Sequence, residues 1–133
     1  MKEILKLKNL KKHFAVKNSW GTDVALVKAL DGVDLKIESG KTFGIVGESG
    51  CGKTTLMRTL LRLVEPTSGS VILSEEITGN NFSSNNLEEL TSEELRNFRK
   101  QIGVVFQDPM GALNPRMLIK DIVSEPLVIH GKT

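Results

Sequence analysis

The chain has 133 residues, with 18 lysines and arginines against 16 aspartates and glutamates and a formal net charge of +2. This length predicts one domain or part of one, and so mild a charge does not indicate a nucleic-acid-binding protein. A single cysteine excludes an internal disulfide, and no apolar run approaches the roughly 20 residues that cross a bilayer, so no membrane-spanning segment is expected.

The first predicted element is a strand over residues 4–10. Leu5 and Leu7 alternate with Lys6 and Lys8, as in an antiparallel strand with one buried face. We interpret the lysines of the first twelve residues as a solvated strand face rather than a binding patch. His13 follows them, and we expect it at the surface because its neighbours do not resemble a set of metal ligands.

Phe14 stands where this first strand leads into a turn, which is predicted over residues 17–23 and contains Trp20. An aromatic residue at such an edge fits two roles. It could stack on an adenine ring, an interaction worth roughly 1–3 kcal/mol per base in proteins that bind single strands. It could equally be a core residue, and the spacing alone does not decide between the two.

Further strands are predicted over residues 24–30 and 33–38, and a strand buried on both faces over residues 42–46. Residues 55–63 predict a helix, because Leu56, Leu60 and Leu63 recur at helical spacing. Between this last strand and the helix, residues 47–54 match the pattern G-x-x-x-x-G-K-[ST] of phosphate-binding loops. The order of strand, loop and helix is the context that this pattern requires.

The chemistry of this loop indicates a nucleoside triphosphate bound with Mg²⁺. Backbone N–H groups of a glycine-rich loop bind phosphate oxygens where the loop enters a helix N-terminus. Lys53 is predicted to reach the β and γ phosphates, and the Thr54 hydroxyl to be a ligand of Mg²⁺. We interpret Cys51 as a small loop residue, because the sequence offers its thiol no evident basic partner. The predicted nucleotide-binding residues of the loop are Gly47, Glu48, Ser49, Gly50, Cys51, Gly52, Lys53, Thr54 and Thr55.

The second half of the chain predicts shorter elements. A strand is expected over residues 70–73, a polar loop over about 74–90, and a helix over residues 93–100 with its cap in the segment Thr91–Glu94. The apolar run of residues 101–106 predicts another strand. Asp121 is expected to cap a short helix over residues 122–125, which Pro126 should interrupt.

Three of these pieces together resemble the ATP-binding subunits of ABC transporters, and within them the oligopeptide and dipeptide importer group. The first is Val-Lys-Ala-Leu-Asp-Gly-Val at residues 27–33, and the second is the phosphate loop with its flanks at residues 46–55. The most discriminating piece is Val-Phe-Gln-Asp-Pro at residues 105–109 with Ala-Leu-Asn-Pro-Arg-Met at residues 112–117. The resemblance implies an α/β fold of the P-loop NTPase type over residues 1–133. It would be the N-terminal half of an ABC ATPase domain, an antiparallel β subdomain followed by the phosphate-loop strand and helix.

The same resemblance implies roles for two residues outside the phosphate loop. Phe14 matches the aromatic residue that stacks on adenine. Gln107 matches the glutamine of the Q-loop, here about residues 106–117, whose amide approaches Mg²⁺ and the γ phosphate; it is a catalytic candidate together with Lys53. Implied partners are the transmembrane permease subunits and a second ATP-binding subunit that closes over the nucleotide. The implied location is the cytoplasmic face of the cell membrane.

The sequence departs from the family in one respect. It contains no signature motif, no Walker B aspartate with a following glutamate and no switch histidine, and His130 follows the Q-loop too closely to replace the last of these. We therefore expect this chain to correspond to the N-terminal half of a longer subunit, to bind nucleotide weakly and not to turn it over. Because strands of the missing half would cover its apolar strands, we also expect self-association.

Two alternatives belong to other classes of protein. A small-molecule kinase or GTPase also has a phosphate loop, but the N-K-x-D segment of a GTPase does not occur, and a kinase usually begins near its loop. A non-enzymatic module would bind nucleotide and a membrane partner through the region after Gln107. The transported solute is beyond this sequence.

Overall fold

The computed structural model describes residues 2–21, 23–79 and 82–131. Its elements in chain order are β1 (Glu3–Lys17), β2 (Asp23–Glu38), α1 (Lys53–Leu60), β3 (Ser68–Leu73), α2 (Glu75–Thr78), the 3-10 helix η1 (Leu87–Glu89), α3 (Ser92–Arg99), α4 (Pro109–Ala112) and α5 (Ile119–Ile129). They form two compact units, residues 1–99 and residues 100–133.

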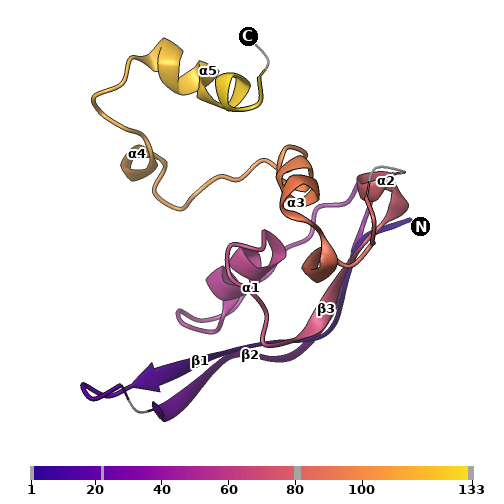
Figure 1. The fold of residues 1–133 in the computed structure, drawn as a ribbon, viewed down its shortest axis with the longest axis vertical. Coiled ribbons are helices and arrows are strands. Elements are labelled where there is room, and N and C mark those ends of the chain that lie inside the picture. The colour runs from indigo at the N-terminus through magenta and orange to yellow at the C-terminus, as the bar shows by residue number, and fades with distance from the viewer. Residues whose placement is uncertain (1, 22, 80–81, 132–133) are drawn as a thin grey trace. The chain divides into compact units, whose positions relative to one another are not determined.

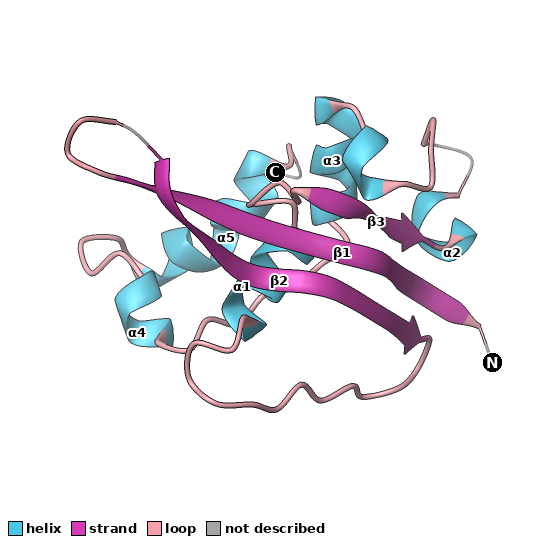
Figure 2. Cartoon of the chain, turned by 90° about the horizontal axis from the view of Figure 1, so that it is seen from below, coloured by secondary structure: helices cyan, strands magenta, loops and turns pink. Residues whose placement is uncertain are grey.

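The first unit is built on an antiparallel sheet with the strand order β2-β1-β3. The strands β1 and β2 form a long hairpin, and α1 and α3 lie on one face of the sheet (Figures 1 and 2). The two strands predicted over residues 24–30 and 33–38 are one continuous strand, β2. The predicted strand over residues 70–73 is confirmed as β3, with two more residues at its start.

An irregularity in β1 places two leucines on the same face of the sheet. Leu7 and Leu10 are three residues apart, so simple alternation would point them to opposite faces. The register with β2 shifts between them, and Asn9 has a positive φ of 46°, so both side chains are buried. The core consists of Leu7, Leu10, Leu30, Leu56, Leu61, Val71, Leu73, Leu87, Leu90 and Phe98.

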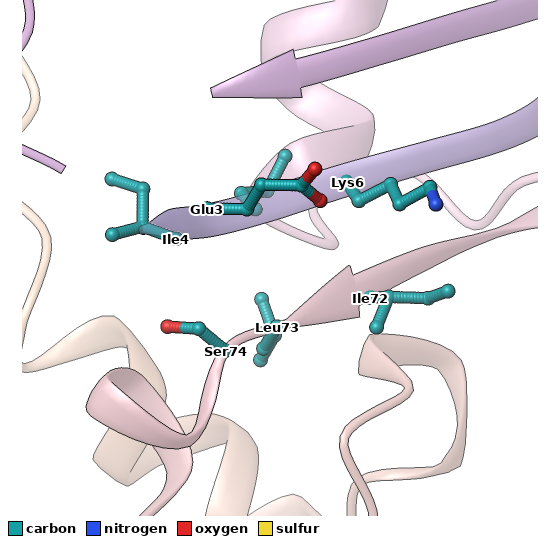
Figure 3. A pocket seen from close by; sticks show the side chains of 7 residues that line it. Glu3, Ile4, Lys6, Ile72, Leu73 and Ser74 are labelled. Carbon is teal, nitrogen blue, oxygen red and sulfur yellow. The ribbon is translucent and has the colours of Figure 1, made fainter. Parts of the chain in front are cut away.

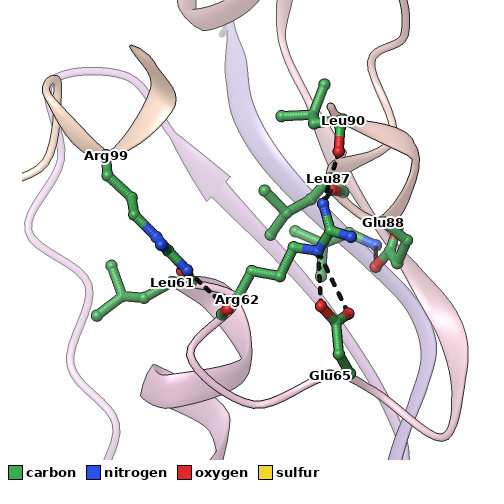
Figure 4. A network of polar contacts seen from close by, with 8 residues as sticks. Leu61, Arg62, Glu65, Leu87, Glu88, Leu90 and Arg99 are labelled. Carbon is green, nitrogen blue, oxygen red and sulfur yellow. Dashed lines mark hydrogen bonds and ion pairs between the residues drawn. The ribbon is translucent and has the colours of Figure 1, made fainter. Parts of the chain in front are cut away.

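Two arginines fasten the C-terminal end of α1 to the segment that carries η1 and α3 (Figure 4). The Arg62 guanidinium donates hydrogen bonds to the carbonyl oxygens of Leu87 and Leu90, at 3.2 and 2.8 Å, and pairs with Glu65. Arg99 donates to the carbonyl oxygens of Leu61 and Arg62, at 3.1 and 2.8 Å. These carbonyl groups follow the last turn of α1, where backbone acceptors lack partners within the helix.

The predicted helix over residues 93–100 is confirmed as α3, and its cap is reciprocal. The Glu94 backbone N–H donates to Thr91 Oγ1 at 3.3 Å, and the Glu94 carboxylate accepts the Thr91 N–H at 2.8 Å. This is the capping box that the Thr91–Glu94 segment predicted. The polar loop predicted over residues 74–90 instead contains α2 and η1; residues 80 and 81 lie outside the described part of the chain.

Two predicted strands are wrong. The strands predicted over residues 42–46 and 101–106 do not form: Gln101 lies in a turn, and the other residues have no regular secondary structure. Apart from the half-buried Ile102, their apolar side chains are exposed, with Val46 at 94% and Val105 at 87%. A strand of a parallel sheet needs neighbours that supply hydrogen bonds and cover both faces. No strand among the described residues pairs with either segment. The two segments are apolar, as the prediction assumed, but neither pairs with another strand in the described part of the chain.

The described residues of the second unit, 100–131, contain two helices, α4 and α5. Asp108 lies just before α4, and its carboxylate accepts a hydrogen bond from the Gly111 N–H of that helix at 3.0 Å. The prediction that Asp121 caps a helix ended by Pro126 is wrong, since α5 begins at Ile119 after Leu118 and continues past Pro126 to Ile129. Proline removes one backbone hydrogen bond from a helix without always breaking it. None of the helices in the described residues is long and apolar enough to cross a membrane.

The Glu94 carboxylate makes the stability of the first unit depend on pH. Hydrogen bonds from the Thr91 backbone, then from Ser83, lower the pKa of Glu94 from 4.5 to about 2. A lowered pKa stabilises the folded state above the unfolded pKa, and the contribution is lost as pH falls from about 4.5 towards 2. The unfolding temperature, measured by circular dichroism, should therefore decrease less steeply for Glu94→Gln than for the wild type as the pH is lowered over this range.

Glu93→Gln is the matched control for this measurement, because Glu93 is an exposed acid in the same first turn of α3. Its unfolding temperature should follow the wild-type pH dependence. Equal slopes for Glu94→Gln and the wild type would show that the capping box does not contribute as described.

Candidate nucleotide-binding site

The loop of residues 47–54 leads directly into the N-terminus of α1. Helix α1 begins at Lys53, preceded by Gly52 with a φ of 96°, and the Leu56 N–H donates to the Gly52 carbonyl oxygen at 2.8 Å. Among the described residues, no side chain caps this helix. The N–H groups of its first turn are therefore available to an anion, which the helix dipole also favours.

Gly52 allows the loop to lie in close contact with strand β2 of the sheet. A Cβ at this position would lie 2.4 Å from the carbonyl oxygen of Ala29 in β2 and 3.4 Å from Leu30 Cδ2. Only glycine combines this approach with a left-handed backbone conformation at low cost. The register explains the protruding carbonyl: Lys12 pairs with Leu30 and His13 with Lys28, so Ala29 is the extra residue of a β-bulge.

The Lys53 ammonium group lies over the loop. Its Nζ donates to the carbonyl oxygens of Gly47 and Glu48, both at 2.7 Å, and lies 3.3 Å from the Cys51 sulfur. In the described part of the chain, no carboxylate forms an ion pair with it. Its partners are neutral carbonyl groups and a thiol, so the positive charge remains available to a bound phosphate.

Cys51 has the basic partner that the sequence argument did not find. The hydrogen bond with the Lys53 ammonium lowers the pKa of the exposed Cys51 thiol. The same sulfur would lie 2.7 Å from a Cβ at Gly47, so the loop closes tightly at this point. Cys51 and Lys53 are two residues apart in sequence, and only the turn of the loop brings their side chains together.

The donors present fit a hydrated divalent cation that is held mainly by phosphate. Thr54 is exposed in the first turn of α1, beside Lys53. The described residues contain no cluster of three or more His, Cys, Asp or Glu side chains that could hold a metal ion. Mg²⁺ typically takes one or two protein oxygens and completes its shell with phosphate and water. One hydroxyl beside a phosphate loop satisfies that requirement.

Phe14 lies on the same hairpin that seats the loop. It pairs with Val27 in β2, two residues and roughly 7 Å along the strand from Ala29. The residue is 39% exposed, and the Lys12 ammonium lies 4.9 Å from the centroid of its ring. Gln107 belongs to the second unit, where it is exposed in a bend before α4.

Sequence reasoning missed Ala29 and the side-chain partner of His13. His13, which was expected at the surface, is partly exposed, with 15% of its side chain accessible, and its Nε2 lies 2.9 Å from Asp31 Oδ1. A small cavity of about 110 Å³ lies between the start of β1 and the end of β3, lined by residues such as Ile4, Lys6 and Leu73 (Figure 3). It lies towards the opposite end of β1 from Phe14 and is not part of the loop site.

The uncapped helix, the glycine-rich loop and the unpaired lysine define this protein as a phosphate-loop nucleotide-binding protein. Comparison with protein-family models narrows the class: residues 30–127 match the model for the ABC transporter family. The chain belongs to the ABC transporter family, as its sequence resemblance implied.

Several similar relatives are ATP-binding proteins of peptide transport. The chain is 46% identical over 123 residues to the dipeptide transport ATP-binding protein DppF of Haemophilus influenzae, covering 92% of this chain and 35% of that protein. It is 42% identical over 127 residues to the putative oligopeptide transport ATP-binding protein YkfD of Bacillus subtilis, covering 96% and 34%. The chain thus spans about a third of the length of these relatives.

Solved structures agree on the fold. A dimeric, post-hydrolysis form of the ATP-binding cassette MJ0796, bound to ADP and Pi, matches with a TM-score of 0.72 and 30% identity. The match covers 98% of this chain and 48% of that one. The predicted fold class, the N-terminal half of an ABC ATPase domain, is therefore confirmed, although the phosphate-loop strand is not formed.

Gly52→Ala should destabilise the first unit by at least about 1–3 kcal/mol, the usual cost of a strained backbone conformation. The new Cβ would meet the Ala29 carbonyl, and the positive φ is unfavourable for alanine. The measurement is the free energy of unfolding in urea. Gly44→Ala is the control, because its Cβ would meet nothing within 4 Å; equal stabilities of the two variants would contradict the proposed seat of the loop.

Proposed function

We propose that this chain is the ATP-binding part of an ABC transporter ATPase subunit that energises import of peptides or a related small solute. The observation that carries the proposal is the phosphate loop itself, with Lys53 held at 2.7 Å from two loop carbonyl groups at an uncapped helix N-terminus. The ABC family match and the peptide-transport relatives favour this class over a small-molecule kinase or a GTPase.

In this proposal the residues of the first unit bind and orient the nucleotide. Backbone N–H groups of residues 47–55 hold the phosphate oxygens, and the Lys53 ammonium stabilises negative charge at the β and γ phosphates. Phe14 stacks on the adenine. Thr54 would be a ligand of Mg²⁺, which, when bound, neutralises charge on the β and γ phosphates. Gln107, in the second unit, is proposed as a further Mg²⁺ ligand from the family resemblance alone.

The proposed partners follow from the ABC transporter family and from the dimeric state of a solved member. They are transmembrane permease subunits, docked through the region after Gln107, and a second ATP-binding subunit in a nucleotide-sandwich dimer; the cassette MJ0796 is itself dimeric. Such a protein works on the cytoplasmic face of the membrane. The non-enzymatic alternative, a nucleotide-dependent interaction module, shares the binding step and differs only in lacking turnover.

Lys53→Ala should weaken binding of Mg·ATP to the chain by roughly ten- to a hundredfold, because a hydrogen bond to a charged group contributes about 1.5–3 kcal/mol. Isothermal titration calorimetry measures the affinity. Lys41→Ala is the matched control, since it removes an exposed lysine from the segment that leads into the loop and should leave the affinity unchanged. Equal affinities for wild type and Lys53→Ala would overturn the proposed function.

The same chain should release no phosphate above background, since the sequence contains none of the family motifs that handle the attacking water. A phosphate-release assay with Mg·ATP checks this. Sustained release that Lys53→Ala abolishes would show that the chain is catalytically competent by itself.

We further propose that the chain self-associates through its two unpaired apolar segments, residues 42–46 and 102–106. Exposed extended segments of this composition pair readily with other chains. Light scattering should report species larger than a monomer, reduced in the double variant Val46→Lys/Val105→Lys. Trp20→Lys, which removes an equally exposed apolar residue at 90% exposure, should not reduce them. A stable, monodisperse wild-type monomer would contradict this proposal.

A further inference from the structure

Near His13 the three-stranded sheet narrows to the two-stranded hairpin of β1 and β2. The pairing of β1 with β3 extends only to Lys11, opposite Ser68, so beyond this point the hairpin is a two-stranded arm, residues 14–17 and 23–28. This arm carries Phe14 and further exposed apolar side chains, including Leu26 at 57% and Val27 at 50%. A two-stranded ribbon is only marginally stable by itself. The direction of the arm therefore depends on the contacts at its base.

His13 makes contacts to both sides at this base. Its backbone N–H donates to Thr67 Oγ1 at 2.9 Å, next to the start of β3, and its Nε2 lies 2.9 Å from Asp31 Oδ1 in β2. Asp31 also pairs with Lys28 at 3.2 Å. The His13 side chain is 15% exposed, whereas Lys28 is 57% exposed. Asp31 is 43% exposed, so His13 is the more shielded of its two partners.

The contact between His13 and Asp31 crosses the hairpin at the bulge that seats the phosphate loop. Ala29 is the extra residue between Lys28 and Leu30, and its carbonyl oxygen is the group that Gly52 approaches. Bulges bend a strand and increase its twist. A bond between imidazole and carboxylate across such a bend restricts the angle of the arm relative to the loop, and with it the position of Phe14.

We propose that His13 is a positioning residue for the base of the nucleotide, and that its bond to Asp31 fixes the arm so that Phe14 is preorganised for stacking. This inference rests on the proposed function, because it takes Phe14 as the stacking residue. Without the bond the arm must be ordered on binding, and the cost of that ordering reduces affinity. In the proposed site the phosphates bind at residues 47–55, away from Phe14, so only the part of the affinity that depends on the base should fall.

The test compares two ligands, Mg·ATP and Mg·tripolyphosphate, by calorimetric titration of the 133-residue chain. Tripolyphosphate contains the phosphate groups without the base. His13→Ala should weaken Mg·ATP binding by roughly three- to tenfold, a share of the stacking contribution, and leave tripolyphosphate binding unchanged. In a Phe14→Ala background, His13→Ala should cause no further loss, because the two residues act through the same contact.

Three further variants separate positioning from general destabilisation. Asp31→Ala breaks the same bond from the other strand and should reproduce the loss. His13→Gln keeps a side-chain N–H donor and should restore much of the ATP affinity. Lys28→Ala removes only the exposed partner of Asp31 and should bind both ligands as the wild type does. The melting temperature of each variant, measured by circular dichroism, identifies any that fail to fold.

The results distinguish failure of this inference from failure of the proposed function. If His13→Ala and Asp31→Ala lower affinity for both ligands equally, or leave ATP binding intact where Phe14→Ala weakens it, His13 is not a positioning residue. If wild type and Phe14→Ala both bind ATP no better than tripolyphosphate, Phe14 does not stack on the base and the inference falls, while the phosphate loop stands. If the wild type binds neither ligand, the proposed function itself is overturned.

Discussion

The close approach of Gly52 to the Ala29 carbonyl oxygen is the constraint on which the site depends. A side chain at residue 52 would lie 2.4 Å from that oxygen, so the loop can rest on the β-bulge only because residue 52 is glycine. This contact places the uncapped N-terminus of α1 against the hairpin that also carries Phe14. The loop and the aromatic residue are thus both positioned by β2, the loop at Ala29 and Phe14 through its pairing with Val27.

The C-terminal end of α1 is fixed by hydrogen bonds from two arginine side chains. Arg62 donates to carbonyl oxygens in the segment of η1, and Arg99 donates to carbonyl oxygens just after the last turn of α1. Leu56 and Leu61 are buried in the core beside them. A helix fixed at both ends presents its first-turn N–H groups in one orientation. A preorganised anion site of this kind avoids paying for its own ordering when phosphate binds.

The elements predicted correctly from the sequence are those that depend on neighbours in the chain. The alternation of Leu5 and Leu7, the Thr91–Glu94 capping box and the pattern from Gly47 to Thr54 are local, and each identifies its element. The apolar runs around Ile45 and Val104 also predicted strands, but a strand forms only with partners that no local pattern supplies. The bulge at Ala29 and the contact of His13 with Asp31 depend on the pairing register between β1 and β2, which composition does not encode.

The central claim is that main-chain N–H groups around the start of α1, assisted by Lys53, bind a magnesium-bound triphosphate. The most direct test is the change in backbone amide chemical shifts, recorded by nuclear magnetic resonance while Mg·ATP is added to the isotope-labelled chain. We expect the largest changes at residues 48–55, with a second, smaller group around Phe14. Changes absent from residues 48–55 at saturating nucleotide, or confined to another surface, would contradict the account.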